Sequence, residues 1–336
     1  MSPEDTLIVG AGPIGLACAI SAKRRGVDPL VIDAGAVVNS ILHYPIGMSF
    51  FTTPDRLEIG GHPVVCSGEK PTRREALMYY REVVRAEALR VLTYTKLVGA
   101  RHTDAGLLCE LESRSASAGA DGHVQSSTSP ESRFELQTER LVLATGYFDH
   151  PNALEVPGDD LPHVFRYFDE AHASYNLDVV VIGGKNSAVE AALQLYRAGA
   201  RTTLVYRRSE FTKSVKYWLK PDIENRMAGG EIAGRLGADV LRIEKNAVVI
   251  LRSDGETERL KADRVYALIG FQPDTELFRR VGIEIEPETG VPRHDPDTLE
   301  TNVPGVYVAG SITSGYRTSD IFIENGRFDG EKIFRD

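Results

Sequence analysis

The chain has 336 residues, of which 42% are hydrophobic and 26% charged, so it can fill the cores of two ordinary globular domains. Its 39 Lys and Arg against 48 Asp and Glu give a net charge of −9, and no basic stripe stands out, which argues against a nucleic-acid partner. No apolar run approaches the roughly 20 residues that span a bilayer, and no basic, apolar leader precedes the first strand. We therefore expect a cytoplasmic protein with no membrane partner.

A βαβ unit is predicted at the start of the chain. Residues 6–9 form an apolar strand that enters a glycine-rich turn, and residues 16–25 form an Ala-rich helix that ends at Gly26. Residues 30–32 then form a second strand, which Asp33 closes.

The middle of the first half mixes a helix with short strands. We predict a helix over 73–89, strands over 91–95 and 107–112, and, further on, strands over 134–138 and 141–144. Between them, residues 113–132 are rich in Ser, Gly and Ala and almost free of apolar residues. This composition predicts a mobile hairpin tip without a catalytic role.

A second βαβ unit repeats the pattern of the first. It has a strand over 179–182, a glycine turn, a helix over 188–198 and a strand over 203–206. Proline-containing linkers over 147–158 and 271–276 flank it, and the tail ends in a helix from about Ser319.

Two such units in one chain predict an α/β fold with two Rossmann-like dinucleotide-binding domains, the second inserted into the first. We expect one domain over 1–154 and 272–336, and the inserted domain over 155–271.

The first glycine turn, Gly10 to Gly15, is a GxGxxG motif between strand and helix. Gly10 makes the tight turn, Gly12 lets backbone N–H groups approach a pyrophosphate, and Gly15 lets helix and strand pack closely. The positive end of the helix favours the diphosphate. Asp33, at the end of the next strand, is suited to a ribose hydroxyl. The complete unit predicts a dinucleotide site.

The second glycine turn, Gly183-Gly184-Lys185-Asn186-Ser187-Ala188, departs from the strict motif because Lys185 replaces the middle glycine. Lys185 either contacts phosphate or points to solvent. Where the first unit has an acid, this one has Arg207 and Arg208, whose guanidinium groups match a 2′-phosphate. This predicts NADPH rather than NADH; the alternative is a solvated basic loop, which Lys213 and Lys216 extend.

Apart from the Ser-rich stretch, the whole chain resembles the thioredoxin reductase-like flavoproteins, and more narrowly the bacillithiol disulfide reductase family. The narrower likeness is carried by residues 39–61, 144–152, 179–193, 205–211 and 322–330. The resemblance implies an NADPH-dependent flavoprotein oxidoreductase that binds FAD and reduces the disulfide of a low-molecular-weight thiol. It also implies a homo-oligomer.

The resemblance includes the ends of two predicted strands, and at two positions this chain differs from the related proteins. Thr145-Gly146 and Gly305 to Gly310 match segments that close the FAD domain of these proteins, where an acid follows the second segment. Here Ser311 takes the place of that acid, a variant that, like Lys185, fits the narrower family better than thioredoxin reductase itself. Family members often carry a cysteine beside the flavin where this chain has Ile14.

These motifs and the resemblance give two sets of cofactor-binding residues, and no metal site is predicted. For FAD they are Gly10, Gly12, Pro13, Ile14, Gly15, Asp33, Asn39, Tyr44, Thr145, Gly146, Tyr147, Gly310, Ser311 and Ile323. For NADPH they are Gly183, Gly184, Lys185, Asn186, Ser187, Arg207, Arg208 and Lys213.

The catalytic residues are not fixed by the sequence. The three cysteines, Cys18, Cys66 and Cys109, form no CxxC pair, which argues against a disulfide framework and excludes an adjacent redox dithiol. Cys18 and Cys66 are candidates for a redox role, with packing as the alternative. His43 and His62 are candidate proton donors, again with packing as the alternative.

The acceptor also has alternatives. Without a dithiol in the protein, the final electron acceptor is either a small-molecule disulfide or a small redox protein. The second case corresponds to a thioredoxin reductase-like ferredoxin– or flavodoxin–NADP reductase. A flavin- and NADPH-binding redox sensor without turnover is an alternative of another class.

Overall fold

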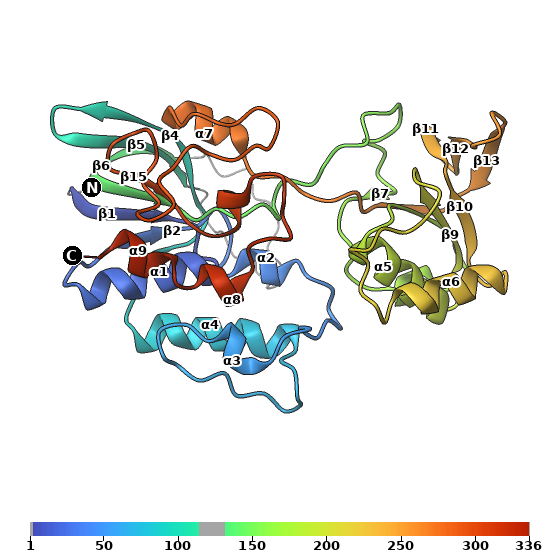
Figure 1. The fold of residues 1–336 in the computed structure, drawn as a ribbon, viewed down its shortest axis with the longest axis horizontal. Coiled ribbons are helices and arrows are strands. Elements are labelled where there is room, and N and C mark those ends of the chain that lie inside the picture. The colour runs from blue at the N-terminus through green and yellow to red at the C-terminus, as the bar shows by residue number, and fades with distance from the viewer. Residues whose placement is uncertain (1–2, 114–131, 336) are drawn as a thin grey trace. The chain divides into compact units, whose positions relative to one another are not determined.

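The computed structural model describes residues 3–113 and 132–335, which form two compact units (Figure 1). The first unit contains Met1–Leu42, Met48–His150 and Phe271–Asp336, and the second contains His43–Gly47 and Pro151–Gly270. The predicted limits at 154/155 and 271/272 lie close to two of these unit limits. The short segment His43–Gly47 was not expected in the second unit.

The first unit is built on a seven-stranded sheet in the order β3-β2-β1-β6-β5-β4, with β15 also beside β6. Its strands are β1 (Glu4–Val9), β2 (Leu30–Ile32), β3 (Arg90–Leu92), β4 (Thr95–Thr103), β5 (Gly106–Ser113), β6 (Ser132–Leu143) and β15 (Val306–Val308). The neighbours β3, β2, β1, β6 and β15 run parallel, whereas β4, β5 and β6 pair antiparallel. The long strand β6 therefore belongs to both parts.

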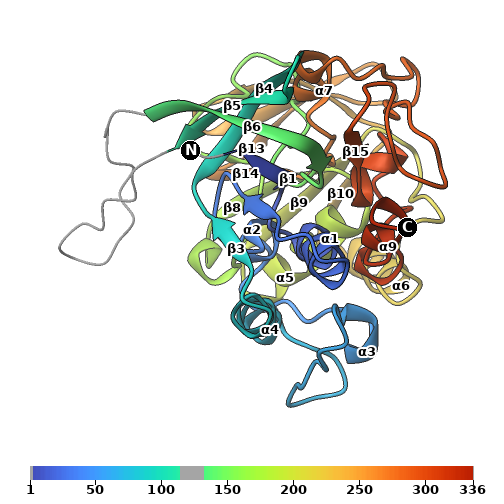
Figure 2. The same cartoon turned by 90° about the vertical axis from the view of Figure 1, so that its left-hand side faces the viewer.

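Helices cover both faces of this sheet, α7 on one side and α1 on the other (Figure 2). Leu7 and Val9 of β1 pack in one core with Phe278 of α7, because alternate side chains of a strand point to the same face. The helices are α1 (Pro13–Arg24), α2 (Asn39–Leu42), α3 (Pro54–Leu57), α4 (Arg73–Ala86), α7 (Thr275–Val281), η2 (Gly310–Ser314), α8 (Ile323–Gly326) and α9 (Asp329–Ile333). α9 lies alongside α1.

The second unit has a five-stranded parallel sheet, β10-β9-β8-β14-β7, and a three-stranded antiparallel sheet, β11-β12-β13. The strands are β7 (Val164–Phe165), β8 (Asp178–Ile182), β9 (Arg201–Tyr206), β10 (Ala233–Leu236), β11 (Asp239–Glu244), β12 (Ala247–Leu251), β13 (Thr257–Lys261) and β14 (Arg264–Ala267). The helices are η1 (His172–Ser174), α5 (Asn186–Arg197) and α6 (Lys220–Ala228).

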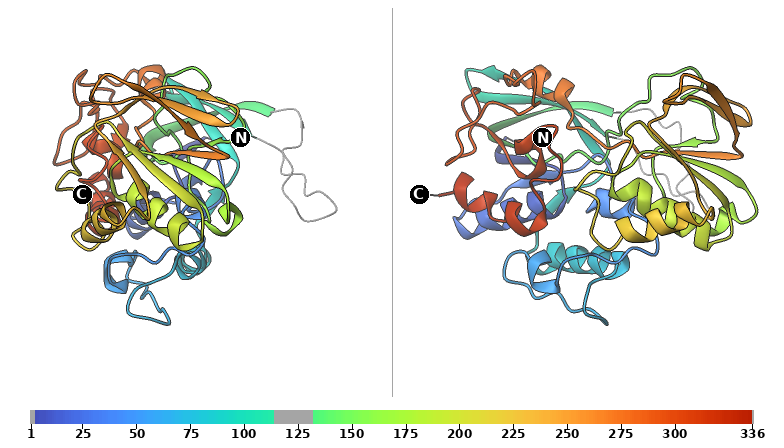
Figure 3. Two further views of the ribbon diagram at one scale, coloured as in Figure 1. Left: turned by 90° about the vertical axis from the view of Figure 1, so that its right-hand side faces the viewer. Right: turned by 45° about the vertical axis from the view of Figure 1, so that its right-hand side comes forward.

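Strand β8 separates two cores of this unit. Val179 and Val181 pack with the apolar face of α5, whereas Val180 and Ile182 pack with Val248 of the three-stranded sheet. A strand buried on both faces needs a continuous apolar run, and DVVVI supplies one. Figure 3 shows the helices on one side of the five-stranded sheet and the small antiparallel sheet on the other.

Some predicted elements were wrong in detail. The single strand predicted over 91–95 is two strands, β3 and β4, separated by a turn in which Tyr94 has φ +55°. The strands predicted over 134–138 and 141–144 are one strand, β6, and the single tail helix is two short helices, α8 and α9. The predicted mobile hairpin tip lies outside the described residues, except for Ser113 and Ser132, which pair at its base. No helix in the described ranges combines the length and apolar content needed to cross a membrane.

Candidate dinucleotide-binding sites

The first glycine turn packs closely against the sheet at Gly10 and Gly15 and leaves open space at Gly12. Gly10 has φ +110°, and a Cβ there would lie 2.3 Å from the carbonyl oxygen of Ala144. A Cβ on Gly15 would lie 1.9 Å from the carbonyl oxygen of Gly10, so helix α1 approaches the strand as closely as glycine permits. A Cβ on Gly12, in contrast, would meet no atom within 4 Å.

Within the described residues, no side chain caps the N-terminus of α1 and competes there with an anion. Gly12 is the N-cap, no side chain caps the helix, Pro13 is its first residue, and the first turn carries no acid. The free N–H groups and the helix dipole therefore point into the open space above Gly12, where a diphosphate gains most from them.

Asp33 follows β2 and borders this turn. Its Oδ2 accepts the Ala11 N–H at 2.8 Å, and its Oδ1 accepts the Gly35 N–H at 2.7 Å. Burial raises the pKa of the Asp33 carboxyl, and these two N–H donors oppose that effect. Each oxygen keeps a further acceptor position for a ribose hydroxyl. Asn39 completes the loop, since its Oδ1 accepts the Ala36 N–H at 3.3 Å.

The carboxyl ends of β6 and β15 bring Thr145, Gly146 and Ser311 together. Gly146 has φ +67°, and a Cβ there would lie 3.9 Å from Ser311 Oγ. The Thr145 hydroxyl is buried and has no hydrogen-bond partner within the described part of the chain. A buried hydroxyl without a partner is uncommon, and a bound polar ligand would satisfy it. With the open amide turn and Asp33, these residues fit FAD.

Ile14 lies where η2 and α8 meet the first turn of α1. A Cβ on Gly310 or on Gly326 would come within 2.7 Å of Ile14 Cδ1, so the two glycines line the notch that the isoleucine occupies. The structure therefore gathers Ile14, Gly310, Ser311 and the helix that begins at Ile323 around one end of α1.

Asp329 is a residue that the sequence analysis missed. Its Oδ2 accepts the Gly310 N–H at 2.8 Å, so α9 supplies a carboxylate to the turn in which Ser311 stands in place of an acid. Burial raises the pKa of the Asp329 carboxyl, while the Gly310 N–H, Lys332 and His294 lower it. The sequence shows Asp329 as an acid at the start of the last helix, but its contact with Gly310 depends on how that helix packs in the fold.

We expect Asp329→Ala to weaken FAD binding by about tenfold, because the Gly310 turn loses a charge-assisted hydrogen bond worth roughly 1.5 kcal/mol. Asp329→Asn keeps an acceptor oxygen and should retain most of the affinity. Titration of the apoprotein with FAD, followed by flavin fluorescence, measures both. Equal affinities in wild type and Asp329→Ala would contradict this role.

The three cysteines differ in their surroundings, and all are free. Cys18 is fully buried in α1, where burial and then the neighbouring Asp329 raise the pKa of its thiol far above the usual value. Burial in β5 raises the pKa of the Cys109 thiol to about 12. Cys66 is half-buried, and its Sγ donates to the carbonyl oxygen of Gly68 at 3.0 Å. Cys18 and Cys109 therefore have the character of buried apolar side chains rather than of reactive thiols.

We expect iodoacetamide at pH 8 to modify Cys66 alone in the native protein, because both buried thiols stay protonated there. NADPH oxidation should continue at the unmodified rate, and Cys66→Ser should behave in the same way. Intact-mass measurement gives the number of alkylated sites. Inactivation that follows Cys66 modification and is absent in Cys66→Ser would show that this thiol takes part.

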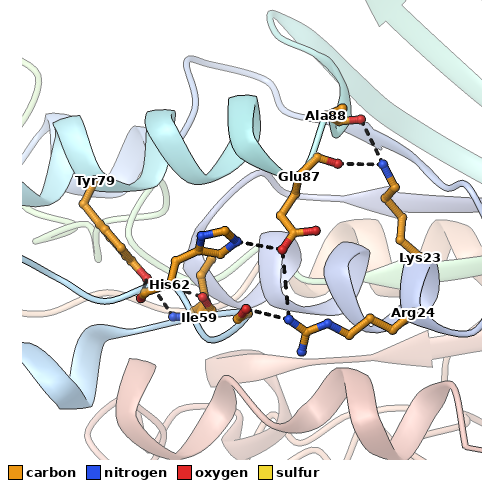
Figure 4. A network of polar contacts seen from close by, with 8 residues as sticks. Lys23, Arg24, Ile59, His62, Tyr79, Glu87 and Ala88 are labelled. Atoms are coloured by element: carbon orange, nitrogen blue, oxygen red, sulfur yellow. Dashed lines mark hydrogen bonds and ion pairs between the residues drawn. The ribbon is translucent and has the colours of Figure 1, made fainter.

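His62 belongs to a polar network at the C-terminal end of α1 (Figure 4). Its Nε2 lies 2.7 Å from Glu87 Oε1, and its carbonyl oxygen accepts the Tyr79 hydroxyl at 2.8 Å. Lys23 Nζ donates to the Glu87 carbonyl oxygen at 2.6 Å, and Arg24 reaches the carbonyl of Gly60. The network joins α1, α4 and the segment before it. α1 has 12 residues, so its two ends are roughly 18 Å apart, and His62 is not at the glycine turn.

His43, Tyr44 and Tyr147 were also predicted to lie near the flavin. His43 and Tyr44 belong to the short segment of the second unit, where the His43 ring centroid lies 6.1 Å from that of Tyr167. Tyr147 packs in the first unit with its ring centroid 6.3 Å from that of Phe271, and burial raises the pKa of its hydroxyl. Their roles at a flavin remain predictions.

The second glycine turn repeats the first in the second unit. Gly183 has φ +138°, and a Cβ there would lie 2.4 Å from the carbonyl oxygen of Leu268. A Cβ on Gly184 would lie 2.3 Å from the Tyr206 ring, so this glycine is required by a close contact. Lys185 is the exposed N-cap of α5, which has no side-chain cap and no acid in its first turn.

Cations border this turn on the side of β9. Arg207, Arg208 and Lys213 are exposed. Within the described residues, none of their side chains forms an ion pair. Ser187 is exposed and Asn186 half-buried at the helix start. An uncapped helix N-terminus beside unpaired guanidinium groups fits a dinucleotide that carries an extra phosphate.

The chain is similar to known proteins over almost its whole length. Residues 7–310 match the family described as pyridine nucleotide-disulphide oxidoreductase. The chain is 42% identical to bacilliredoxin reductase Bdr of Bacillus subtilis, covering 99% of this chain and 97% of the relative. The solved structure of the bacillithiol disulfide reductase Bdr from Bacillus cereus has a TM-score of 0.91 at 39% identity, covering 99% of this chain and 98% of that one.

A thioredoxin reductase structure from T. acidophilum shares the fold alone, with a TM-score of 0.72 at 19% identity, covering 99% of this chain and 97% of that one. The predicted thioredoxin reductase-like fold and the predicted class of flavin-dependent disulfide reductase are thereby confirmed. The family and its neighbours imply the use of a flavin and of NADP(H). The chain belongs to the pyridine nucleotide-disulphide oxidoreductase family.

Proposed function

We propose that this chain is an FAD-dependent reductase that takes electrons from NADPH and reduces the symmetric disulfide of a low-molecular-weight thiol. The balanced reaction is NADPH + RSSR + H⁺ → NADP⁺ + 2 RSH. Bound FAD would supply the chemistry by accepting a hydride and passing two electrons on. Two solved relatives are named bacillithiol disulfide reductase, which makes bacillithiol disulfide the first acceptor to test.

The observation that carries the proposal is the pair of uncapped helix N-termini, one in each unit. The first, at Gly12, is accompanied by a ribose-type acid, Asp33, and the second, at Lys185, by Arg207 and Arg208. These differences favour FAD in the first unit and NADPH in the second, because a carboxylate suits a free hydroxyl and guanidinium suits a phosphate.

A small disulfide is favoured as the acceptor by the solved relatives that are named bacillithiol disulfide reductase. Among the described residues, no reactive thiol lies beside the first glycine turn to act as a relay. Ile14 occupies the notch between Gly310 and Gly326, and Cys18, one turn further along α1, is fully buried. Neither forms a mixed disulfide in that position. The chain's own residues would then bind and orient the substrate disulfide, with His43 as a candidate proton donor.

The decisive experiment is an anaerobic titration of the purified protein. NADPH should bleach the flavin absorbance near 450 nm with one equivalent per FAD, and bacillithiol disulfide should restore it catalytically. Reoxidation by ferredoxin or flavodoxin alone would favour the carrier reductase instead. Reduction without turnover on any acceptor would favour a sensor. A colourless protein that does not take up FAD would overturn the proposal.

We also propose that the chain works as a homo-oligomer, since closed symmetric assemblies are the usual state of such soluble enzymes. Sedimentation equilibrium of the FAD-loaded protein tests this, and a monomer at micromolar concentration would contradict it.

A further inference from the structure

Two aromatic side chains of the second unit are exposed side by side. Tyr217 is 84% exposed and Trp218 48%, and their ring centroids lie 4.9 Å apart at an interplanar angle of 89°. Trp218 is the one tryptophan of the chain. Large aromatic surfaces in water are costly, and a neighbouring pair is typical of a surface that receives a planar or apolar ligand.

The segment that carries this pair is fastened to the second glycine turn. Asn186, the first residue of α5, accepts the Lys216 N–H on Oδ1 at 2.8 Å and donates from Nδ2 to the Ser214 carbonyl oxygen at 3.1 Å. The chain from Lys216 then turns, since the Leu219 N–H donates to the Lys216 carbonyl oxygen at 2.9 Å. Trp218 is two residues from the fastened Lys216, so their Cα atoms are within roughly 7.6 Å.

The position of this segment in the sheet points to the adenosine half of a dinucleotide. It leaves the carboxyl end of β9, the strand that lies next to β8. In folds of this type the ligand lies outside the carboxyl ends of the strands, and its adenosine lies beside the strand that follows the glycine turn. The segment thus returns to the helix N-terminus on the side where adenosine lies.

Charge on the same segment matches that ligand. Arg207, Arg208 and Lys213 are exposed cations on it. Lys216 Nζ lies 5.4 Å from the centroid of the Trp218 ring. Adenine is planar and stacks on aromatic side chains, while the cations suit the phosphates beside it.

We propose that Tyr217 and Trp218 form the adenine-binding surface of the NADPH site, with Asn186 as the positioning residue that fastens it to the glycine turn. The inference rests on the proposed use of NADPH and adds the residues that recognise its base. The aromatic pair would bind the adenine, which NADPH and NADH share, whereas Arg207 and Arg208 would bind the 2′-phosphate, which only NADPH has. The two sets of substitutions should therefore have different signatures.

The test uses the FAD-loaded protein and adenosine 2′,5′-bisphosphate, which has the adenine and the 2′-phosphate but cannot reduce a flavin. Calorimetry gives its Kd, and the fluorescence of the single tryptophan reports whether Trp218 contacts it. We expect the fluorescence to change on binding. Trp218→Ala and Tyr217→Ala should each weaken binding by about tenfold.

Two variants separate stacking and positioning from general damage. Trp218→Phe keeps an aromatic face and should bind nearly as well as wild type. Asn186→Ala should weaken binding by several-fold although Trp218 and Tyr217 are intact, and it should lower the tryptophan fluorescence change. FAD absorbance should match wild type in all four variants. Melting temperature should match wild type in the three variants at Tyr217 and Trp218, because neither residue lies in a core cluster. It should fall slightly in Asn186→Ala, which loses two hydrogen bonds.

The outcomes distinguish this inference from the proposed function. Tight binding with unchanged fluorescence, and unchanged affinity in Trp218→Ala and Tyr217→Ala, would overturn the adenine surface and leave NADPH use intact. Absence of any binding to wild type, together with no flavin reduction by NADPH, would overturn the proposed function and the inference with it.

Discussion

Gly12→Ala should strongly weaken FAD binding and leave the protein folded. Gly12 has φ −70° and ψ 172°, an extended conformation that any residue adopts, and an added Cβ would meet no protein atom within 4 Å. The methyl group would instead enter the space above the N-terminus of α1, where the pyrophosphate has to approach the backbone. We expect at least about a hundredfold loss of affinity for FAD, equivalent to roughly 3 kcal/mol. Fluorescence titration of the apoprotein measures it.

Gly15→Ala is the matched control, three residues further along. There a Cβ would lie 1.9 Å from the Gly10 carbonyl oxygen, so α1 would have to move away from the sheet. Such overpacking costs about 1–3 kcal/mol or more, and the melting temperature of the apoprotein should fall. Gly12→Ala should melt like wild type. A yellow Gly12→Ala protein with full FAD content would show that the pyrophosphate does not lie above Gly12.

The two βαβ units were predictable because their signals are local. Gly10 and Gly183 are at turns with positive φ, and Gly15 lets α1 approach the strand closely. DVVVI is a run that a strand buried on both faces requires. Asp33 follows its strand directly, so its place beside the turn was also predictable from order alone.

Other features depend on contacts between distant segments and were missed. The break at Tyr94, a non-glycine residue with φ +55°, has no local signature and divides one predicted strand into two. Asp329 meets Gly310 only because α9 packs along α1, where Gly330 allows a close approach to Cys18. The segment His43–Gly47 joins the second unit through the Ile46 N–H, which donates to the Asp169 carbonyl oxygen at 2.9 Å.

The double substitution Arg207→Ala, Arg208→Ala should convert the protein from an NADPH-dependent enzyme into one that barely distinguishes NADPH from NADH. Both side chains are exposed beside the uncapped N-terminus of α5 and form no ion pair within the described residues. Their guanidinium groups are therefore free to bind a 2′-phosphate in bidentate fashion. We expect KM for NADPH to rise by about a hundredfold, with KM for NADH within about twofold of wild type.

A control for net charge is available in the same unit. Arg242 and Arg259 both pair with Glu244 on the three-stranded sheet, at 3.0 and 2.9 Å, and their double alanine variant removes the same two charges. It should leave the preference for NADPH intact. Ionic strength gives a second readout, because KM for NADPH should rise with salt in wild type and stay nearly flat once Arg207 and Arg208 are gone. Equal losses for NADPH and NADH in the Arg207, Arg208 variant would mean that these arginines serve the fold or the pyrophosphate, and that the 2′-phosphate is bound elsewhere.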